Sequence, residues 1–213
     1  MCYTIEINLT REEIEKRFGS KFKNEEEYTR GKKVSAFSLP ALPVICSDNP
    51  DEVKIMTWGL IPSWIKDEEN ANSIRRKTFN ARCETLDKKP SFRNSFKFKR
   101  CMVLVNGFYE WQHTGREKIP YFIKLKDVNS FALAGLFDNW YNKNTGEKVN
   151  TFTVITTKAN PMMEIIHNTQ KRMPAILTPL NEKDWLNPAY KDNRLSDFLK
   201  PFDEKLMLAE KLN

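Results

Sequence analysis

The stretch CMVLVNGFYEWQ, from Cys101 to Gln112, contains two runs of strand-forming residues on either side of Asn106-Gly107. The first run is almost entirely apolar, which is typical of a buried strand. Asn-Gly is favoured in tight turns, so the stretch predicts two strands joined by a turn. The second run alternates between two faces, with Phe108, Glu110 and Gln112 on one and Tyr109 and Trp111 on the other.

Similar runs occur on both sides of this stretch. They cover residues 2–7, 33–37, 42–46, 52–58, 121–125, 130–137, 151–157 and 173–177. Pro40 and Pro43 have no backbone N–H to donate, so we expect the two runs beside them to lie at sheet edges or in turns.

Helices are indicated towards both ends of the chain. A capping box formed by Thr10 and Glu13 begins a helix that ends at Gly19, and Pro161 begins a short helix over 161–167. Two or three helices are expected from Asn181 onward. Strands in the middle with helices around them predict an α+β fold. The length suits a single domain over residues 1–213, with C-terminal helices at 181–213.

The composition is that of an ordinary globular protein, with 40% hydrophobic and 30% charged residues. No apolar run approaches the length of a membrane span, about 18 residues. The N-terminus lacks the basic and apolar series of a secretory signal. We therefore expect a cytoplasmic protein that has no membrane partner.

The net charge of +7 is concentrated in one segment. Residues 75–100 hold ten basic and two acidic residues, or +8, and the other 25 basic and 26 acidic residues give −1. The segment begins with Arg75, Arg76 and Lys77, is expected to form short helices between loops, and interleaves Phe79, Phe92, Phe96 and Phe98 with its charges. Basic surfaces with aromatic rings are typical of single-stranded nucleic-acid binding, although a solvated lysine-rich face has a similar composition.

The four cysteines are Cys2, Cys46, Cys83 and Cys101. No two are close in sequence, and neither histidine has ligand spacing to a cysteine, so we predict reduced thiols, no metal and no cofactor. Cys2 directly follows Met1. Removal of Met1 would leave an amine and a thiol on one residue, a pair that captures aldehydes first as a Schiff base and then as a thiazolidine.

Glu110 and His167 each have a catalytic and an ordinary interpretation. Glu110, flanked by two aromatic residues, is either a partly desolvated acid–base group or an exposed residue of a hairpin. His167 ends the helix over 161–167, where the helix dipole favours the protonated imidazole, and is either a catalyst or a capping group. His113 lies in a turn and is expected at the surface.

Asn80 and Arg82 are similarly ambiguous. Asn80 suits the orientation of a substrate oxygen and Arg82 the binding of a phosphate. Alternatively, Asn80 is a helix cap, followed by a solvated arginine, with Cys83 packed within the helix.

Seven stretches, in this order, resemble the SRAP family, the SOS response-associated peptidases or abasic-site processing proteins. They are Cys2, WGLIPSW (58–64), NARCET (80–85), RCMVLVNGFYEW (100–111), AGLFDNW (134–140), TFTVITTKAN (151–160) and the Ile-His that precedes RMPAIL (172–177). The resemblance extends from Cys2 to about Leu177.

The resemblance implies a mostly antiparallel, barrel-like sheet flanked by helices. It also implies a monomer that binds single-stranded DNA at abasic sites, shields the lesion in the DNA damage (SOS) response, and is nucleoid-associated when bound. Cys2 would form a thiazolidine with the aldehyde of the ring-opened deoxyribose. Glu110 would transfer protons, His167 would assist sugar opening and reversal, and Asn80 would orient the reacting groups.

The resemblance further implies which side chains contact DNA. Arg82 and Arg172 would bind phosphate, Trp64 and Trp111 would stack or wedge where the strand kinks, and Arg75, Arg76 and Lys77 would add basic contacts. The family usually begins Met-Cys-Gly-Arg, whereas Tyr3 and Thr4 follow Cys2 here, and Ser35 stands where the family has Asn.

Two other functions remain open from the sequence. One is a cysteine-type peptidase, acting on its own leading methionine or on other proteins, and the other is a non-catalytic single-stranded DNA-binding module. Replacement of Cys2 by Ala separates a binding module from the cross-linking enzyme. The module would keep its affinity and lose nothing, whereas the enzyme would lose covalent capture.

Overall fold

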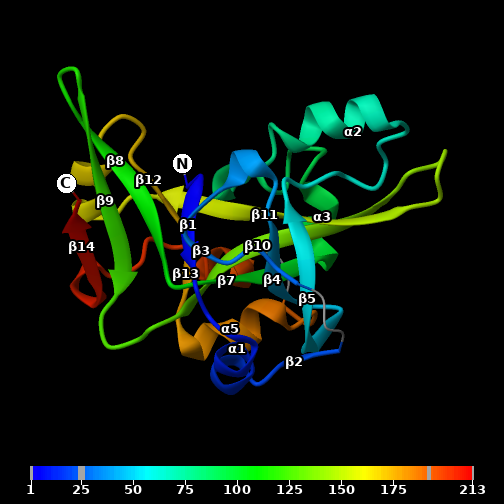
Figure 1. Cartoon of the computed structure of the whole chain (residues 1–213), viewed down its shortest axis with the longest axis horizontal. Coiled ribbons are helices and arrows are strands. Elements are labelled where there is room, and N and C mark those ends of the chain that lie inside the picture. Colours follow the sequence, from blue (N-terminus) through cyan, green and yellow to red (C-terminus); the bar gives the residue numbers. More distant parts are fainter. Residues whose placement is uncertain (1, 24–26, 191–192, 213) are drawn as a thin grey trace.

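The structure, a computed structural model, describes residues 2–23, 27–190 and 193–212 and is built around a closed barrel of five strands (Figure 1). In spatial order these are β11 (Lys148–Lys158), β10 (Phe131–Tyr141), β7 (Arg100–Val105), β4 (Ala41–Cys46) and β5 (Asn49–Trp58). An odd number of strands cannot close with antiparallel pairs alone. The parallel pair β11–β5 closes the ring, with Thr151 beside Thr57. The predicted α+β class with a barrel-like sheet is confirmed.

A second, five-stranded antiparallel sheet lies beside the barrel. Its strands, in spatial order, are β14 (Met207–Lys211), β9 (Glu117–Leu125), β8 (Gly107–Thr114), β1 (Thr4–Ile7) and β3 (Gly31–Ser35). The β8–β9 hairpin extends beyond the barrel at one side of the molecule (Figure 1). Because β1 lies between β8 and β3, the N-terminal residues enter the middle of this sheet rather than its edge.

Four short strands and the helices complete the described chain. The strands are β2 (Lys21–Phe22), β6 (Asn80–Arg82), β12 (Arg172–Pro174) and β13 (Ile176–Leu177). The helices are α1 (Arg11–Phe18), α2 (Glu68–Arg75), α3 (Arg93–Phe98), α4 (Pro161–Ile166), α5 (Pro179–Leu186) and α6 (Asn193–Asp197), with 3-10 turns η1 (Ala36–Ser38), η2 (Cys83–Thr85) and η3 (Glu204–Leu206). None of the helices in these residues is long and apolar enough to cross a membrane.

The Asn106-Gly107 step joins the two sheets instead of closing a hairpin. The two predicted strands are present as β7 and β8, but β7 pairs with β10 and β4, whereas β8 pairs with β1 and β9. Asn106 fixes the joint, since its Oδ1 accepts from Asn8 N at 2.7 Å and its Nδ2 donates to Asn129 O at 2.8 Å. The turn prediction was therefore wrong about pairing, because long-range partners outcompete a local turn.

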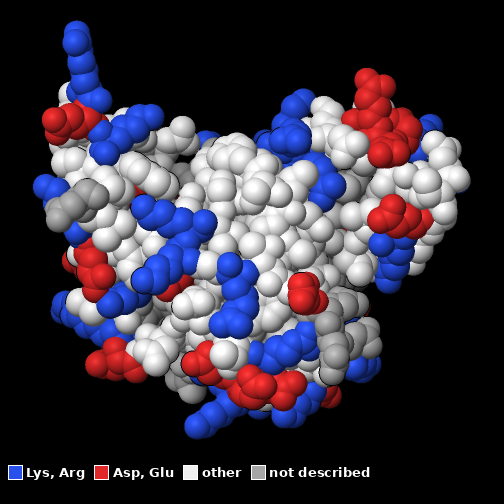
Figure 2. Space-filling view, in the orientation of Figure 1, with Lys and Arg blue, Asp and Glu red and all other residues white. Residues whose placement is uncertain are grey.

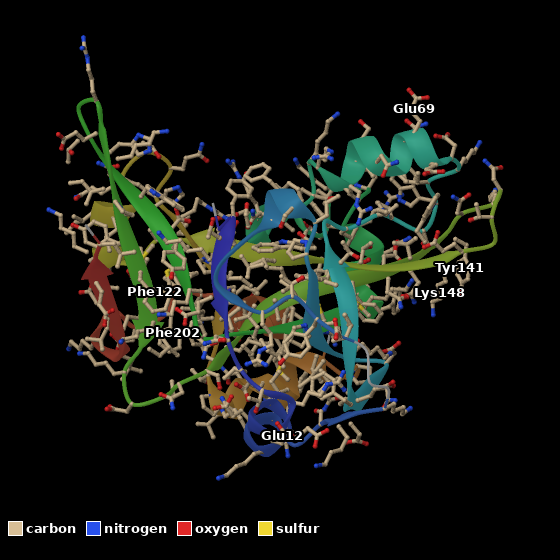
Figure 3. All side chains as sticks on the ribbon, viewed as in Figure 1. Glu12, Glu69, Phe122, Tyr141, Lys148 and Phe202 are labelled. Atoms are coloured by element: carbon tan, nitrogen blue, oxygen red, sulfur yellow. The ribbon has the colours of Figure 1, made fainter. Side chains whose placement is uncertain are left out.

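Gly107 is needed for space rather than for a left-handed backbone. A Cβ there would lie 2.5 Å from two ring carbons of Phe122 and 2.6 Å from Ile123 O. Figure 3 labels Phe122 on β9, and its ring lies against Gly107, the first residue of β8. The close approach holds β8 against β9 immediately before the residues that matter for function.

Two other expectations were wrong. Pro43 was expected at a sheet edge or in a turn, but it lies in β4, a barrel strand with neighbours on both sides. The proline is tolerated because the pairing of β4 with β7 begins only at Val44. The segment 181–213 contains helices but ends in β14, which adds to the edge of β9 with Met207 opposite Leu125. The residues of β14 favour helices in isolation, and the open edge of β9 overrides that preference.

Candidate active site at the junction of the two sheets

The pairing of β1 with β8 brings the N-terminal residues to Glu110. Thr4 lies opposite Tyr109 and Ile5 opposite Phe108. Continuing this antiparallel register places Tyr3 across from Glu110. The structure thus brings together two predicted residues, Cys2 and Glu110, that are more than a hundred positions apart in sequence.

Cys2 is fully buried and is held from the barrel side by Asn80. Asn80 lies on β6, not at a helix cap, and its Nδ2 donates to Cys2 O at 2.9 Å. Its Oδ1 is buried and has no hydrogen-bond partner among the described residues. Burial, followed by the charge of Glu110, raises the pKa of the Cys2 thiol. The thiol therefore stays protonated at neutral pH, and its reaction requires a proton acceptor beside it.

Glu110 is buried on β8, which excludes the interpretation as an exposed hairpin residue. Burial raises the pKa of its carboxyl to about 7. A group with a pKa near neutral is present in both its acid and its base form, as proton transfer in both directions requires.

His167 lies directly after α4, and its Nε2 is 3.8 Å from Glu110 Oε2. Its Nδ1 is 2.8 Å from Arg172 O. Burial lowers the pKa of His167 below its ordinary value, so the neutral imidazole is favoured. Burial thus acts against the protonated imidazole that the position at the helix end was expected to favour.

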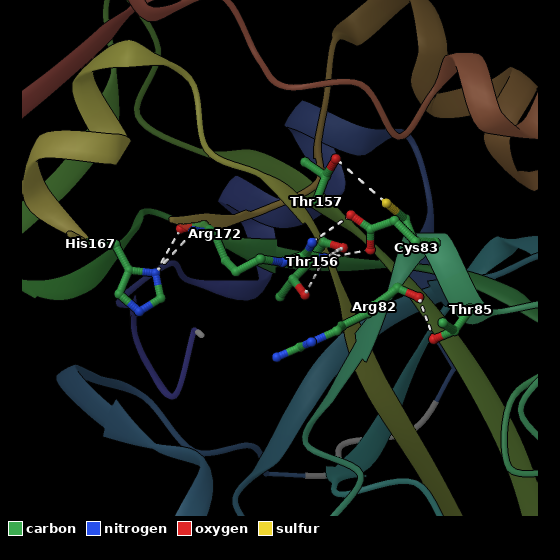
Figure 4. A network of polar contacts seen from close by, with 8 residues as sticks. Arg82, Cys83, Thr85, Thr156, Thr157, His167 and Arg172 are labelled. Atoms are coloured by element: carbon green, nitrogen blue, oxygen red, sulfur yellow. Dashed lines mark hydrogen bonds and ion pairs between the residues drawn. The ribbon is translucent and has the colours of Figure 1, made fainter. Parts of the chain in front are cut away.

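Arg172 is held inside the protein rather than exposed for a ligand. Its guanidinium forms a two-point ion pair with Glu84, at 2.5 and 3.0 Å, and donates to Thr156 O at 2.6 Å. Figure 4 shows this network continuing from Arg172 to the His167 ring. The predicted phosphate contact of Arg172 thus competes with internal partners, and its carbonyl instead orients the histidine.

A pocket of about 540 Å³ opens over this site. Its lining includes Tyr3, Glu110, Trp111 and His167, which come from β1, β8 and the end of α4. His113 also lines it and is half-buried; it lies in β8 rather than in the expected turn. The strand alternation that indicated the faces of Glu110 and Trp111 continues to His113 and places Tyr109, Trp111 and His113 on one face.

The basic residues of segment 75–100 separate into a group near the surface and a group that serves the fold. Arg82 is exposed at the end of β6, and Arg76 and Lys77 are exposed after α2, while Arg75 is half-buried and burial lowers its pKa. Lys99 and Arg100 serve the fold: Lys99 pairs with Asp138 at 2.5 Å, and Arg100 donates to four backbone carbonyls. The charge excess of residues 75–100 therefore overstates the basic surface available to a ligand.

The predicted stacking residues also separate. Trp111 lines the pocket beside Glu110, but Trp64, which is 51% exposed, lies in another pocket of about 480 Å³ that it shares with Lys77. Of the four phenylalanines in the basic segment, Phe79 and Phe92 are buried, Phe96 is partly buried, and Phe98 is 71% exposed.

The surface around the site is hollowed and flanked by positive charge. Figure 2 shows a hollow between the β8–β9 hairpin and α2, with an uncharged floor and Lys or Arg side chains on both sides. In the described part of the chain, no group of three His, Cys, Asp or Glu side chains is placed to hold a metal ion.

Known proteins resemble this chain in sequence and in fold. The abasic site processing protein YoqW of Bacillus subtilis is 46% identical over 170 residues, covering 79% of this chain and 72% of that protein. The abasic site processing protein HMCES of Xenopus tropicalis is 40% identical over 140 residues, covering 57% of this chain and 41% of that protein. A crystal structure of a protein from Bacteroides thetaiotaomicron superposes with a TM-score of 0.95 at 40% identity, over 100% of this chain and 92% of that one. The family model described as SOS response associated peptidase (SRAP) matches residues 1–212, and the chain therefore belongs to the SRAP family.

Proposed function

We propose that this chain is an abasic-site processing protein that captures the lesion covalently through Cys2. The observation that carries the proposal is the convergence of four residues: Asn80 donates to Cys2 O, the charge of Glu110 acts on the buried Cys2 thiol, and Glu110 and His167 line one pocket together. The names of the relatives support the same substrate. After removal of Met1, Cys2 would offer an amine and a thiol to the aldehyde of a ring-opened deoxyribose.

The reaction has three steps and releases one water. The Cys2 amine adds to the aldehyde carbon and gives a carbinolamine. The hydroxyl of that intermediate leaves as water, and a C=N bond remains. The sulfur then bonds to the same carbon while the thiol proton ends on the nitrogen, which closes the thiazolidine ring.

The buried acid–base pair suits each of these proton transfers. With a pKa of about 7, Glu110 in its acid form can protonate the departing hydroxyl, and in its base form it can accept the thiol proton. Neutral His167, 3.8 Å away, can accept a proton during opening of the sugar ring. Asn80 Oδ1, a buried acceptor, can orient the amine or the sugar hydroxyl.

Side chains around the pocket would bind the DNA strand. Arg82 and the Arg75, Arg76, Lys77 group would contact phosphates, and Trp111 would stack near the lesion, with Trp64 further along the strand. Arg172 positions His167 through its carbonyl, while Glu84 holds the Arg172 guanidinium. We propose that residues 1–213 act as one domain, as a monomer, on single-stranded DNA.

The experiment is a denaturing gel of a labelled single-stranded oligonucleotide with one abasic site. We expect a slow-migrating adduct with the wild type and none with Cys2→Ala. Cys83→Ala should retain the adduct. This control removes a thiol that, unlike the Cys2 thiol, is only partly buried. Binding by native gel without any adduct would favour a binding module, and cleavage of undamaged polypeptides without DNA would favour a peptidase.

A further inference from the structure

An exposed aromatic ring lies next to the candidate site and has no role in the chemistry described above. Phe37, on η1, is 59% exposed. Its ring centroid is 5.2 Å from that of Tyr3 and 5.3 Å from that of Phe79. Tyr3 and Phe79 also meet, edge to face, at 6.3 Å. In this aromatic trio, Phe37 therefore exposes its ring to solvent while it packs against two more deeply buried rings.

The backbone holds Phe37 in this position relative to the N-terminal residues. Ala36 N donates to Tyr3 O at 2.8 Å, which ties η1 to the residue that follows Cys2. Ser35 Oγ accepts from Phe37 N, and Ser38 Oγ donates to Ser35 O at 2.8 Å. The turn ends at Leu39 with φ of 53°, a left-handed conformation that is strained for a residue with a side chain. The surrounding contacts thus hold a strained turn that keeps this ring at the surface.

The trio is continuous with the pocket and has positive charge beside it. Tyr3 lines the pocket together with Glu110 and His167. Burial and the charge of Glu110 raise the pKa of the Tyr3 phenol, and the Arg82 guanidinium opposes that increase, so Arg82 is close enough to act on Tyr3. Exposed rings next to phosphate-binding cations are the combination that binds single-stranded nucleic acids, because every base has a face that stacks.

We propose that Phe37, supported by Tyr3 and Phe79, is a stacking platform for the nucleobase adjacent to the abasic sugar. The inference rests on the proposed function, which supplies the ligand, single-stranded DNA with an abasic site. It adds a second element of the protein that binds this DNA strand. Stacking of the neighbouring base would fix the position of the lesion relative to Cys2 through the Ala36–Tyr3 hydrogen bond. In this family the residue after Cys2 is usually glycine, so the support from Tyr3 is a feature of this chain.

The test measures equilibrium binding of single-stranded oligonucleotides whose lesion is a stable abasic analogue that lacks the aldehyde. One oligonucleotide keeps the bases on both sides of the lesion, and a second replaces these neighbours by further abasic analogues. We expect Phe37→Ala to weaken binding of the first by roughly 5- to 100-fold, as for loss of one stacked base, and Phe37→Trp to restore it. Binding of the second should be equally weak for wild type and Phe37→Ala.

Phe98→Ala is the matched control. Phe98 is more exposed than Phe37 and also lies among basic residues, but it lies at the other end of β4, where Ser47 Oγ donates to Phe98 O. We expect its removal to leave both affinities unchanged. An equal loss for Phe37→Ala on the two oligonucleotides, or no loss on the first, would overturn the platform. Since the analogue cannot react, these results are independent of whether Cys2 forms an adduct.

Discussion

Replacement of Glu110 by Gln should change how the stability of the protein depends on pH. The buried carboxyl has a pKa of about 7 in the folded protein, against an ordinary value of 4.5. The folded state therefore holds this proton more tightly than the unfolded state does. Between these two values, stability falls as pH rises, because folding then requires either a proton or a buried charge.

The magnitude follows from the two pKa values. A difference of about 2.5 in pKa corresponds to about 3 kcal/mol, of which roughly 2 kcal/mol develops between pH 5 and pH 8. Gln has the same shape and no charge, so it removes this penalty. The stability of Glu110→Gln relative to wild type should therefore rise by roughly 2 kcal/mol over that range.

Urea unfolding followed by circular dichroism at pH 5, 6, 7 and 8 measures this difference. Comparing the two proteins at each pH cancels the titration of groups that the substitution does not affect. Glu117→Gln, at an exposed position at the start of β9, should keep a constant difference from wild type. A difference for Glu110→Gln that does not change from pH 5 to pH 8 would refute the raised pKa, and with it the proposed proton transfers.

Three further outcomes are expected. Gly107→Ala should destabilise the protein by about 1–3 kcal/mol, seen as a lower urea midpoint, because its Cβ would overlap Phe122 and Ile123 O; an unchanged midpoint would contradict the close packing. Glu84→Gln should lower the rate of adduct formation and the melting temperature together, since Arg172 loses its anionic partner; full activity in a less stable protein would exclude a positioning role. Arg82→Ala should reduce the slope of log K against log salt for single-stranded DNA by about 0.7, and a wild-type slope would remove Arg82 from the phosphate contacts.

The strands could be predicted from the sequence better than their partners. β7, β8, β10 and β11 lie close to the runs of apolar and alternating residues that indicated them. Their pairing depends on contacts between distant segments, such as β11 with β5, which no local pattern contains. The Asn106-Gly107 step shows the limit, since the dipeptide favours a hairpin and the fold uses it to change sheets.

The family resemblance implied which residues form the candidate site, but it did not imply how they are arranged. Glu110 is buried because β8 lies between β1 and β9, and burial raises the pKa of its carboxyl to about 7. From the sequence, a desolvated Glu110 was only one of two interpretations. Arg172 illustrates the opposite case. The resemblance implied that Arg172 binds phosphate, whereas its guanidinium is paired with Glu84, from the NARCET stretch.

Of the three rings of the aromatic platform, the sequence indicated only Phe79. Phe37 was one residue of an expected strand, and the phenylalanines that drew attention were those among the basic residues. Three segments far apart in the chain contribute Tyr3, Phe37 and Phe79. Their convergence depends on β1 pairing with β3 and on β6 pairing with β11, which the fold alone reveals.

The intact mass of the protein after reaction with a single-stranded oligonucleotide that carries one abasic site tests the central claim most directly. The free protein should first be shown to lack Met1, so that Cys2 has its amine. The account predicts a species whose mass equals protein plus oligonucleotide minus one water, and its absence in Cys2→Ala. A protein with a free Cys2 amine that binds the oligonucleotide and yields no such species would contradict covalent capture.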